Sequence, residues 1–312
     1  MANSFKEHLQ SHGKSKSTVS HYNTYALDFL AWLDKDKTTI ENATAKEVLS
    51  YLSHLQKRGQ ENKTRNIRLN VIKQFFNFQI DCGHRTENPV QHLKIRGTKT
   101  KKLYPILDKQ QLDKIYNDYK IPDEKDERAN RNWFESYRIG KARNKAILSL
   151  MINQGLTTPE VNNLQLNDLK LKEGKVFIGG GRKSNERILE LKSNQIIELM
   201  EYQFTTRKEL LKFCKEETNN LFISSPPFGR NYNVRTDCKE IWKRLSQELK
   251  KQNKGFINFK QVRTSVITHW LKQFNLRQVQ YFAGHRYVSS TEGYLVNYTE
   301  DLQADIDEFY PF

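Results

Sequence analysis

Apolar residues recur at helical spacing through the N-terminal part of the chain. In residues 17–34 they fall on one face of a helix. Thr44 and Glu47 have the spacing of a capping box at the start of a second helix, which Gly59 is expected to end. A third helix is predicted over residues 62–81. The pattern therefore predicts a small helical bundle.

The third predicted helix has two contrasting faces. Its apolar stripe consists of Leu69, Ile72, Phe76 and Ile80. Its polar stripe consists of Asn66, Asn70, Lys73 and Asn77, with Arg65 and Arg68 beside it. Such a stripe is either a solvated face or a surface that binds DNA, with cations on phosphates and asparagines on base edges. Both interpretations stay open, and Arg65, Arg68 and Lys73 are the candidate DNA contacts.

The pattern changes after Asn88-Pro89, which ends the bundle. Residues 94–104 carry five cations and one glycine. We interpret this segment as an extended linker on the DNA backbone, with Lys99, Lys101 and Lys102 as contacts. A disordered basic hinge is a compatible interpretation. The expected organisation is a helical DNA-binding domain over residues 1–95, a linker over 96–103 and a second domain over 104–312.

The second domain is expected to mix helices with one hairpin. Helices are predicted from Asp108 to about Tyr119, over 141–154, from Thr158 or Pro159, and over 259–271, with a polar surface insertion over 121–139. Residues 175–180 and 186–192 have the pattern of a β-hairpin around the turn GGGRKSN. The expected fold class is an α-helical N-terminal domain joined to a mixed α+β domain, mainly helical with a small antiparallel sheet.

The charge of the chain narrows its partners. Lys and Arg number 52 against 36 Asp and Glu, which gives a net charge of +16 and a pI near 9.6. An excess of this size favours a polyanion over a membrane surface. No apolar run approaches the ~20 residues of a spanning helix, and the N-terminus lacks the apolar core of a signal peptide. We therefore expect a polyanion as the partner of this protein.

The cysteines and histidines offer no cofactor chemistry. The three cysteines, Cys82, Cys214 and Cys238, lack metal-ligand spacing, so we interpret them as reduced thiols of a cytoplasmic protein. The eight histidines form no metal motif, and no phosphate-binding Walker loop is present. We expect no metal and no cofactor.

One C-terminal stretch has the residues for phosphodiester chemistry. Gly284-His285 is followed nine residues later by Tyr294, and a predicted upstream helix opens with Lys260 and Arg263. A phenol is a poor nucleophile at neutral pH, because it is almost fully protonated there. It can attack a phosphodiester when cationic donors hold the phosphate and neutralise the developing charge. Arg263 offers a planar fork for two phosphate oxygens, and His285 offers a further donor.

The ordered set Lys260, Arg263, Gly284-His285 and Tyr294 resembles the C-terminal signature of the tyrosine recombinases, the phage integrase family. The usual form of that signature is HxxR, GH or GW, and Tyr. The N-terminal part is similar to the family's small SAM-like core-binding domain. The matching residues are Thr18, Tyr22, Leu27, Phe29, Trp32 and Leu33, then Thr64, Asn66, Leu69, Ile72, Phe75, Phe76 and Phe78, then Asn88-Pro89. The resemblance covers nearly the whole chain.

The resemblance implies a further catalytic residue in the hairpin turn. The family places a lysine there, commonly as GKGxKER, and Glu186-Arg187 match the ER. Counting back puts Arg182 at the lysine position and Lys183 one residue away. We prefer Lys183, because the acid that protonates the leaving 5′-oxygen must release a proton, which a guanidinium effectively cannot do. A basic turn that touches DNA only electrostatically is the alternative.

The resemblance also implies a reaction and partners. The family cuts and rejoins DNA by transesterification through a 3′-phosphotyrosyl intermediate, without metal or ATP. Its members act on duplex DNA with paired half-sites, as a dimer on a site and a tetramer in synapsis. Integration of a mobile element is a plausible setting. Two other interpretations stay open: a catalytically silent DNA-binding or regulatory protein, and a nicking enzyme similar to type IB topoisomerases.

The sequence departs from the family at its first catalytic arginine. That arginine stands in TGLRxxE, where this chain has Gly155-Leu156-Thr157-Thr158-Pro159-Glu160. Thr157 therefore occupies the arginine position, and losing one such donor costs roughly 3–4 kcal/mol at a transition state. Another cation is expected to compensate, with Arg143, Arg182 and Lys260 as candidates. The alternative is that the protein cleaves DNA poorly or not at all.

The C-terminal tail, residues 295–312, is acidic in a basic chain. It has five Asp and Glu, no Lys or Arg, and apolar residues at helical spacing. It either packs on its own domain or, as the resemblance implies, docks on a neighbouring protomer. The tail also contains Tyr298, the alternative nucleophile. The spacing from His285 favours Tyr294 over Tyr298.

Overall fold

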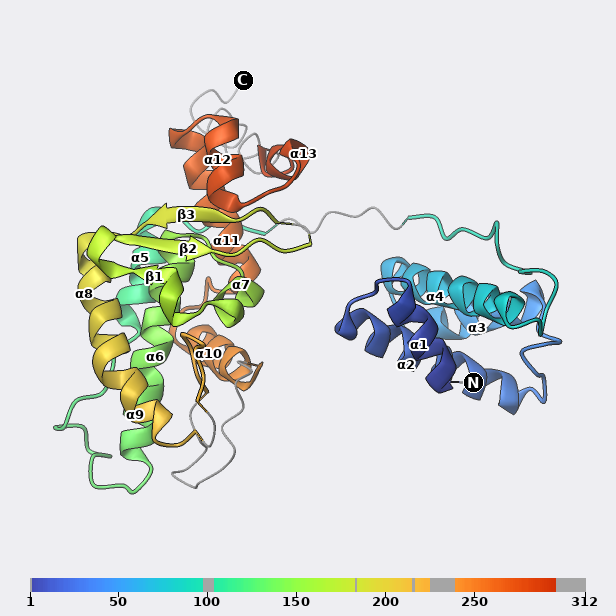
Figure 1. Ribbon diagram of the computed structural model, residues 1–312, viewed down its shortest axis with the longest axis horizontal. Coiled ribbons are helices and arrows are strands. Elements are labelled where there is room, and N and C mark those ends of the chain that lie inside the picture. The colour runs from blue at the N-terminus through green and yellow to red at the C-terminus, as the bar shows by residue number, and fades with distance from the viewer. Residues whose placement is uncertain (1, 98–103, 183, 215–216, 225–238, 296–312) are drawn as a thin grey trace. The chain divides into compact units, whose positions relative to one another are not determined.

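The structure is a computed structural model that describes residues 2–97, 104–182, 184–214, 217–224 and 239–295 (Figure 1). The predicted tail helix, the linker contacts Lys99, Lys101 and Lys102, and the candidate Lys183 lie outside the described residues. The chain divides into two compact units, Met1–Lys102 and Leu103–Phe312. Each has a buried apolar core of its own.

The N-terminal unit is a helical bundle, as the apolar pattern predicts. Its helices are α1 (Ala2–Ser11), α2 (Lys16–Lys35), α3 (Ala45–Lys57) and α4 (Asn62–Asp81). The capping box of Thr44 and Glu47 begins α3, and Gly59 follows its end with φ +79°. Helix α1 was not predicted, because it contributes only two apolar residues to the core. These are Phe5 and Leu9, which are both buried.

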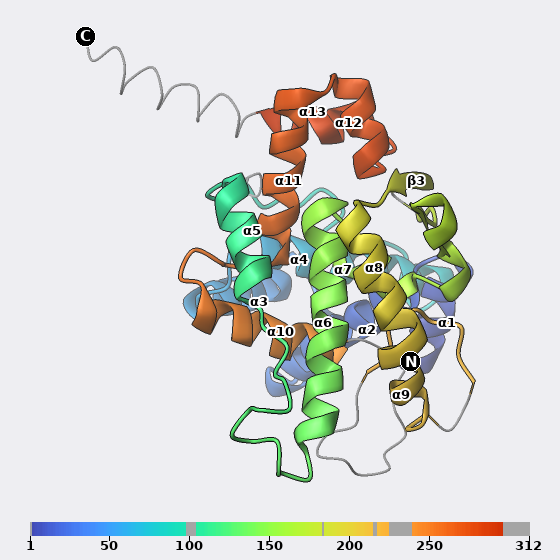
Figure 2. The same cartoon turned by 90° about the vertical axis from the view of Figure 1, so that its left-hand side faces the viewer.

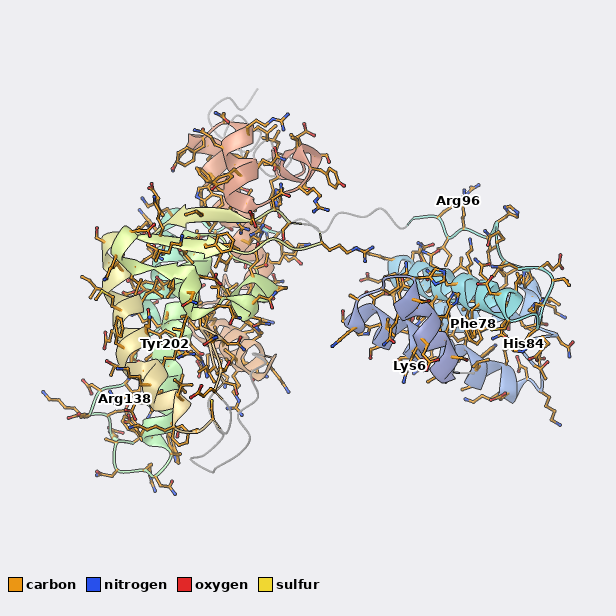
Figure 3. The ribbon with its side chains drawn as sticks, in the orientation of Figure 1. Lys6, Phe78, His84, Arg96, Arg138 and Tyr202 are labelled. Atoms are coloured by element: carbon orange, nitrogen blue, oxygen red, sulfur yellow. The ribbon has the colours of Figure 1, made fainter. Side chains whose placement is uncertain are left out.

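Aromatic side chains fill the centre of this bundle. The Phe5 ring meets the Phe75 ring edge-on with centroids 4.9 Å apart, and lies 5.4 Å from the ring of Phe78, which is labelled in Figure 3. The segment after α4 is held to the bundle by polar groups. Asn88 donates to the Lys73 carbonyl at 3.0 Å, and Arg85 Nη1 donates to three carbonyls of the α2–α3 loop.

The C-terminal unit mixes many helices with one small sheet. Its elements, in chain order, are α5 (Lys109–Asp118), α6 (Phe134–Asn153), α7 (Thr158–Asn163), β1 (Leu169–Lys170), β2 (Lys175–Ile178), β3 (Arg187–Glu190), α8 (Ser193–Glu201), a π-helical turn (Tyr202–Thr206), α9 (Arg207–Leu211), α10 (Lys239–Gln252), α11 (Phe259–Gln273), α12 (Leu276–Ala283) and α13 (Val288–Glu292). Short 3₁₀ turns, Leu166–Asp168 and Leu171–Glu173, flank β1. The expected class, mainly helical with a small antiparallel sheet, is confirmed.

Helix α6 is the centre of this unit. It packs against α5, α8 and α11, and Figure 2 shows these helices around it. The sheet has the order β1-β2-β3 with both pairs antiparallel, and Ile178 is the register partner of Arg187. Helix α12 also contacts β3. The hairpin and the C-terminal helices therefore meet on one side of the unit.

Helix α6 begins earlier than predicted. It starts at Phe134 rather than 141, so the end of the expected surface insertion is helical. The sequence is polar there, but Phe134 and Ile139 are buried, and the buried ammonium of Lys141 pairs with Glu248 at 3.3 Å. Partners supplied by other helices allow these polar residues to lie inside the unit.

Candidate active site

Arg263 lies in the first turns of α11 and joins three segments of the C-terminal unit. The helix begins after Asn258, whose side chain accepts a hydrogen bond from the Gln261 amide. The Arg263 guanidinium is nearly buried and donates to the carbonyl oxygens of Gly155 and Ala283, the latter at 2.7 Å. It is thus fixed between the end of α6 and the end of α12.

Gly284 and His285 form the turn that ends α12. Gly284 has φ +66°, a left-handed conformation that glycine adopts without strain. The His285 amide donates to the Gln280 carbonyl at 3.0 Å, and ring Nδ1 lies 2.9 Å from the buried hydroxyl of Thr291 in α13. When the Thr291 hydroxyl donates, the ring proton lies on Nε2, which can then donate to a ligand.

Tyr294 follows α13 directly and lies beside His285. Its amide donates to the Thr291 carbonyl at 2.9 Å. Its ring stacks on the imidazole with centroids 5.6 Å apart and planes inclined by 16°. A hydrogen bond and the charge interaction with the Tyr294 phenol both favour the charged form of Arg263. The structure therefore brings Arg263, His285 and Tyr294 together, and their catalytic roles stay a prediction.

The site is strongly cationic, and this affects its titration. Burial lowers the pKa of His285 to about 4, and the positive charges of Arg263 and Arg187 act in the same direction. The imidazole is therefore neutral at pH 7. Burial also lowers the pKa of Arg263, against the opposing effect of the Glu160 carboxylate. A guanidinium remains charged at neutral pH even so.

Glu160 is the carboxylate of the site. It lies in α7, where the Thr157 amide and hydroxyl both donate to Oε2 at 2.8 Å in a capping box. Arg187 Nη1 donates to Oε1 at 2.8 Å, and Arg263 Nη1 lies 3.5 Å from Oε2. Burial raises the pKa of Glu160, but the hydrogen bond from Arg187 and the charges of both arginines outweigh it and lower the pKa.

Arg187 is a residue of the site that the sequence pattern did not predict. It begins β3 with a fully buried side chain, and Nε donates to the Phe282 carbonyl at 2.8 Å. A Cβ at Gly284 would clash with Arg187 Nη1, so the glycine makes room for the guanidinium. The match of Glu186-Arg187 to the family's ER was the signal that could have identified it.

The hairpin turn is attached to the Gly284-His285 turn. Ser184 and His285 form an antiparallel bridge, and the Asn185 amide donates to the Gly284 carbonyl at 2.9 Å. Lys183, between Arg182 and this bridge, is outside the described residues. Ser184, the next residue in the chain, therefore contacts the loop that holds His285. The catalytic role of Lys183 stays a prediction.

The other candidate cations lie in different surroundings. Arg182 is exposed, and its carbonyl accepts from Arg286 at 3.1 Å. Lys260 is exposed in the first turn of α11, with Nζ 5.6 Å from the Tyr104 ring centroid. Arg143 is buried in α6, and its guanidinium donates to the Ile223 carbonyl at 3.0 Å and to the Asn144 side chain. Among the described residues, the two cations that pair with Glu160 are Arg263 and Arg187. The three candidates are not among them.

The candidate DNA contacts of α4 are engaged within the bundle. Arg65 is buried and donates to Gln56 and Asn62 at 2.9 and 2.6 Å. The other two are also paired: Arg68 lies 2.9 Å from Asp28 and 2.7 Å from the Tyr51 hydroxyl, and Lys73 donates to the carbonyls of Gln91 and Leu93. Their role on DNA stays a prediction and requires each side chain to exchange these partners for phosphates.

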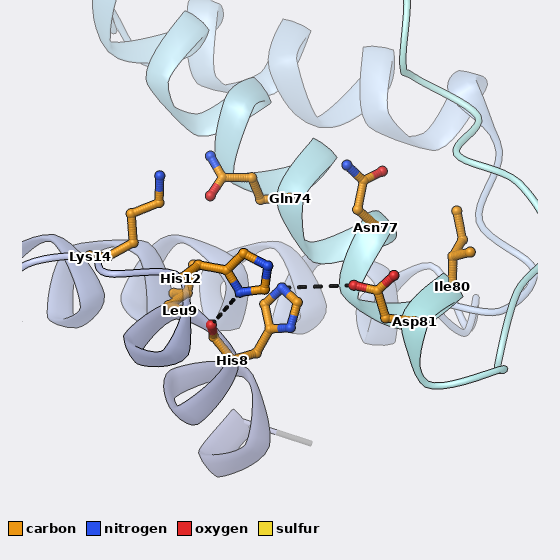
Figure 4. A pocket seen from close by; sticks show the side chains of 8 residues that line it. All are labelled: His8, Leu9, His12, Lys14, Gln74, Asn77, Ile80 and Asp81. Atoms are coloured by element: carbon orange, nitrogen blue, oxygen red, sulfur yellow. Dashed lines mark hydrogen bonds and ion pairs between the residues drawn. The ribbon is translucent and has the colours of Figure 1, made fainter.

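A polar pocket lies between α1 and α4 (Figure 4). Its lining residues are His8, Leu9, His12, Lys14, Gln74, Asn77, Ile80 and Asp81. His8 Nε2 lies 4.0 Å from Asp81, and the His12 ring is hydrogen-bonded to the His8 carbonyl at 2.8 Å. Asn77, predicted on the polar stripe, also accepts from Asn88 at 2.6 Å. Part of that stripe therefore faces a pocket of the bundle.

Three findings concern cofactors, thiols and membranes. In the part of the chain that the structure describes, no group of three or more His, Cys, Asp or Glu is placed to hold a metal ion. Cys82 and Cys214 are free thiols, and Cys238 is not described. Across the same residues, every helix is too short or too polar to cross a bilayer.

The fold and sequence were compared with known proteins. A XerH site-specific recombinase bound to palindromic difH substrate has a TM-score of 0.68 with 15% identity, covering 98% of this chain and 84% of that one. A lambda integrase tetramer bound to a Holliday junction has a TM-score of 0.60 with 15% identity, covering 94% and 75%. These likenesses define the fold as that of the tyrosine recombinases.

Sequence comparison leads to the same class. Tyrosine recombinase XerA of Pyrococcus horikoshii is 24% identical over 306 residues, 97% of this chain and 91% of that protein. Tyrosine recombinase XerC of Oceanobacillus iheyensis is 28% identical over 298 residues, 93% and 89%. Residues 107–301 match the phage integrase family, and residues 2–83 match its N-terminal SAM-like domain. The chain belongs to the phage integrase family.

Proposed function

We propose that this protein is a site-specific DNA recombinase that cuts and rejoins DNA through a covalent bond to Tyr294. The observation that carries the proposal is the cluster of Tyr294, His285 and Arg263, in which the phenol stacks on the imidazole and interacts with the guanidinium. These groups are a nucleophile, a hydrogen-bond donor and a phosphate clamp. Family membership supplies the reaction class for which this set is suited.

The proposed step exchanges one phosphodiester for another. The Tyr294 oxygen attacks phosphorus and loses its proton to solvent, while the bond from phosphorus to the 5′-oxygen breaks. Lys183 gives the leaving 5′-oxygen its proton, which leaves a 5′-hydroxyl and a 3′-phosphotyrosyl bond. The energy of the broken phosphodiester is kept in the phosphotyrosyl bond. A 5′-hydroxyl of another strand can therefore attack that bond and reverse the step. No metal or nucleotide is required.

The remaining side chains stabilise the negative charge that grows on the phosphate. Arg263 donates two N–H groups to non-bridging oxygens, and neutral His285 donates Nε2–H. Lys260, one turn before Arg263 and exposed, adds a flexible positive charge at the phosphate. Arg182 and Arg286 are basic side chains next to the hairpin turn and contact the backbone of the same duplex.

The domains and partners follow from this reaction. We propose residues 1–95 as a core-binding domain, 96–103 as a basic linker and 104–312 as the catalytic domain, which together hold duplex DNA with paired half-sites. The protein acts as a dimer on one site and a tetramer in synapsis, with the tail 295–312 docking on a neighbouring protomer. The cytoplasm is the expected compartment, and a mobile element is the expected genetic setting.

A covalent-adduct assay tests the proposal. Duplexes that bind the protein are first selected from a randomised pool. Substrates are then made with a nick close to each phosphate in turn, so that the short fragment released by cleavage diffuses away and the covalent adduct is trapped. Wild-type protein is expected to form an adduct that survives denaturing electrophoresis, and Tyr294→Phe is expected to bind the same DNA without forming it. Arg263→Ala is expected to lose the adduct while DNA affinity falls only modestly, because it is one phosphate contact among many. Binding by the wild type without any adduct would refute the proposal.

A further inference from the structure

Arg187 has a hydrogen-bonding arrangement that is incomplete in the free protein. Its side chain is fully buried, Nε donates to the Phe282 carbonyl and Nη1 donates to Glu160. Nη2 is also buried and has no hydrogen-bond partner among the residues that the structure describes. A buried N–H without a partner is costly, and more so on a charged group. Nη2 is therefore a donor that is free to bind a ligand.

The positive and negative charges around Glu160 do not balance. Arg187 donates to one oxygen of this carboxylate and Arg263 lies 3.5 Å from the other, so two cations face one anion and one positive charge is left over. His285 adds no charge at pH 7, because its pKa is lowered to about 4. Among the described residues of this cluster the surplus is +1, the charge that one phosphodiester neutralises.

Arg187 also lies near the two residues that contact the nucleophile. The charge of Arg187 acts on both Arg263 and His285, which flank Tyr294. Its guanidinium lies against Gly284, where an added Cβ would be 2.9 Å from Cζ. Arg187 is therefore close to the loop that holds His285.

Thr157 stands where the family has an arginine, so this chain has no guanidinium at that position. In the family pattern an arginine stands at position 157, three residues before the glutamate. Here Thr157 uses its amide and hydroxyl to cap α7 on Glu160 Oε2, and it brings no charge. The other oxygen of the same carboxylate is taken by Arg187, from 27 residues further along the chain.

We propose that Arg187 supplies the guanidinium that Thr157 lacks, donating Nη2 to a non-bridging oxygen of the scissile phosphate while Nε and Nη1 stay on Phe282 and Glu160. This inference rests on the proposed function and adds a phosphate-binding residue to it. Because the guanidinium is already fixed at two of its nitrogens, it loses little freedom when the phosphate arrives. Arg187 is thus a catalytic residue, and Glu160 is its positioning residue.

The test compares a charged and a neutral phosphate. Adduct formation is measured on the nicked duplex with a normal phosphodiester and with a methylphosphonate at the mapped cleavage position, where a methyl group replaces one charged oxygen. Arg187→Gln is expected to form adduct about 100-fold more slowly on the phosphodiester, the loss typical of one such donor. On the neutral methylphosphonate its defect is expected to shrink to less than about tenfold, because less charge needs neutralising.

The matched control is Arg207→Gln. Arg207 is also a buried arginine, but it donates to the carbonyls of Thr218 and Asn220, in a segment without a role in the proposed reaction. Any rate loss in this variant is expected to be equal on both substrates. A second variant, Arg187→Gln with Thr157→Arg, returns a guanidinium to the family position. It is expected to recover at least about tenfold of the lost rate.

Two results would overturn the role of Arg187: an Arg187→Gln rate close to that of wild type, or a defect of equal size on both substrates. If Arg187→Gln does not fold, as judged by loss of its thermal transition, the same comparison is made with Arg187→Lys. That variant keeps the charge but loses the Nη2 donor, so a rate close to wild type would exclude a donor role. A wild-type protein that forms no adduct would instead refute the proposed function, and this inference would fall with it.

Discussion

The imidazole of His285 lies face to face with the phenol ring of Tyr294, with ring centroids 5.6 Å apart and planes inclined by 16°. The two rings are nearly parallel, so the histidine contacts the tyrosine through ring packing. The oxygen is left to Arg263 and to a substrate. The spacing of nine residues between the two therefore has a direct structural meaning: α13 returns the chain so that the two rings meet.

We predict that acid destabilises the protein through His285. The folded protein holds the pKa of this imidazole at about 4, against 6.5 in an unfolded chain. Between these values the imidazole binds a proton in the unfolded state but not in the folded state. The free energy of unfolding therefore falls as the pH is lowered from 6.5 towards 4. Urea denaturation across this range measures it. His285→Asn is expected to weaken the dependence, and an unchanged pH profile would contradict the assignment.

Glu160→Gln is predicted to be strongly destabilising at pH 7. The carboxylate pairs with the fully buried guanidinium of Arg187 and the nearly buried one of Arg263, and breaking a buried ion pair costs roughly 3–5 kcal/mol because a charge is left uncompensated. The pKa of Glu160 is lowered in the folded protein, so its contribution is present above about pH 4.5, the ordinary value, and is lost as the pH falls further. The difference between variant and wild type should therefore narrow in acid. A difference independent of pH below 4.5 would argue against the ion pair.

Gly284→Ala is predicted to disturb both stability and cleavage. The new methyl group would clash with Arg187 Nη1 and lie 3.1 Å from the Asn185 carbonyl oxygen, on a backbone with φ +66°. We expect a loss of roughly 1–3 kcal/mol and a displaced Arg187. Gly59→Ala is the control, since Gly59 has φ +79° with nothing within 4 Å. It should show only the backbone cost of about 1 kcal/mol, so equal losses in the two variants would exclude the contact with Arg187.

Thr291→Val is predicted to impair cleavage without preventing DNA binding. Valine keeps the shape of threonine but removes the hydroxyl that lies 2.9 Å from His285 Nδ1. The imidazole then loses the partner that sets its tautomer, and a buried ring nitrogen without a partner costs roughly 1–3 kcal/mol. We expect a rate of adduct formation about tenfold lower. Thr291→Ser restores the hydroxyl and should approach the wild-type rate, and a slow serine variant would refute the role of the hydrogen bond.

Much of the helical architecture could be predicted from local pattern. Helix α4 has the predicted bounds, Asn62–Asp81, because its apolar residues keep one period throughout. The capping boxes at Thr44 and Asp108 mark helix starts that depend only on neighbouring residues. Helix α1 could not be predicted in this way. Its stability depends on burying Phe5 and Leu9 against partners that are distant in the sequence.

The site was predicted in part, for a similar reason. Arg263, His285 and Tyr294 form an ordered motif, and the structure brings them together. The pairing of Glu160 with Arg187 depends on where the hairpin lies against α7, and spacing alone does not show it. Arg65, Arg68 and Lys73 show the opposite limit. Their helical spacing is typical of a DNA-binding face, yet each is engaged by groups of the bundle that the pattern could not reveal.

The most direct measurement of the central claim is the identity of the residue that becomes attached to DNA. Adduct trapped on the nicked duplex is digested with nuclease and protease, and the modified peptide is sequenced by mass spectrometry. The account predicts a nucleotide linked through its 3′-phosphate to Tyr294, and no such peptide from Tyr294→Phe. Attachment at Tyr298 or at any other residue would contradict the site described here.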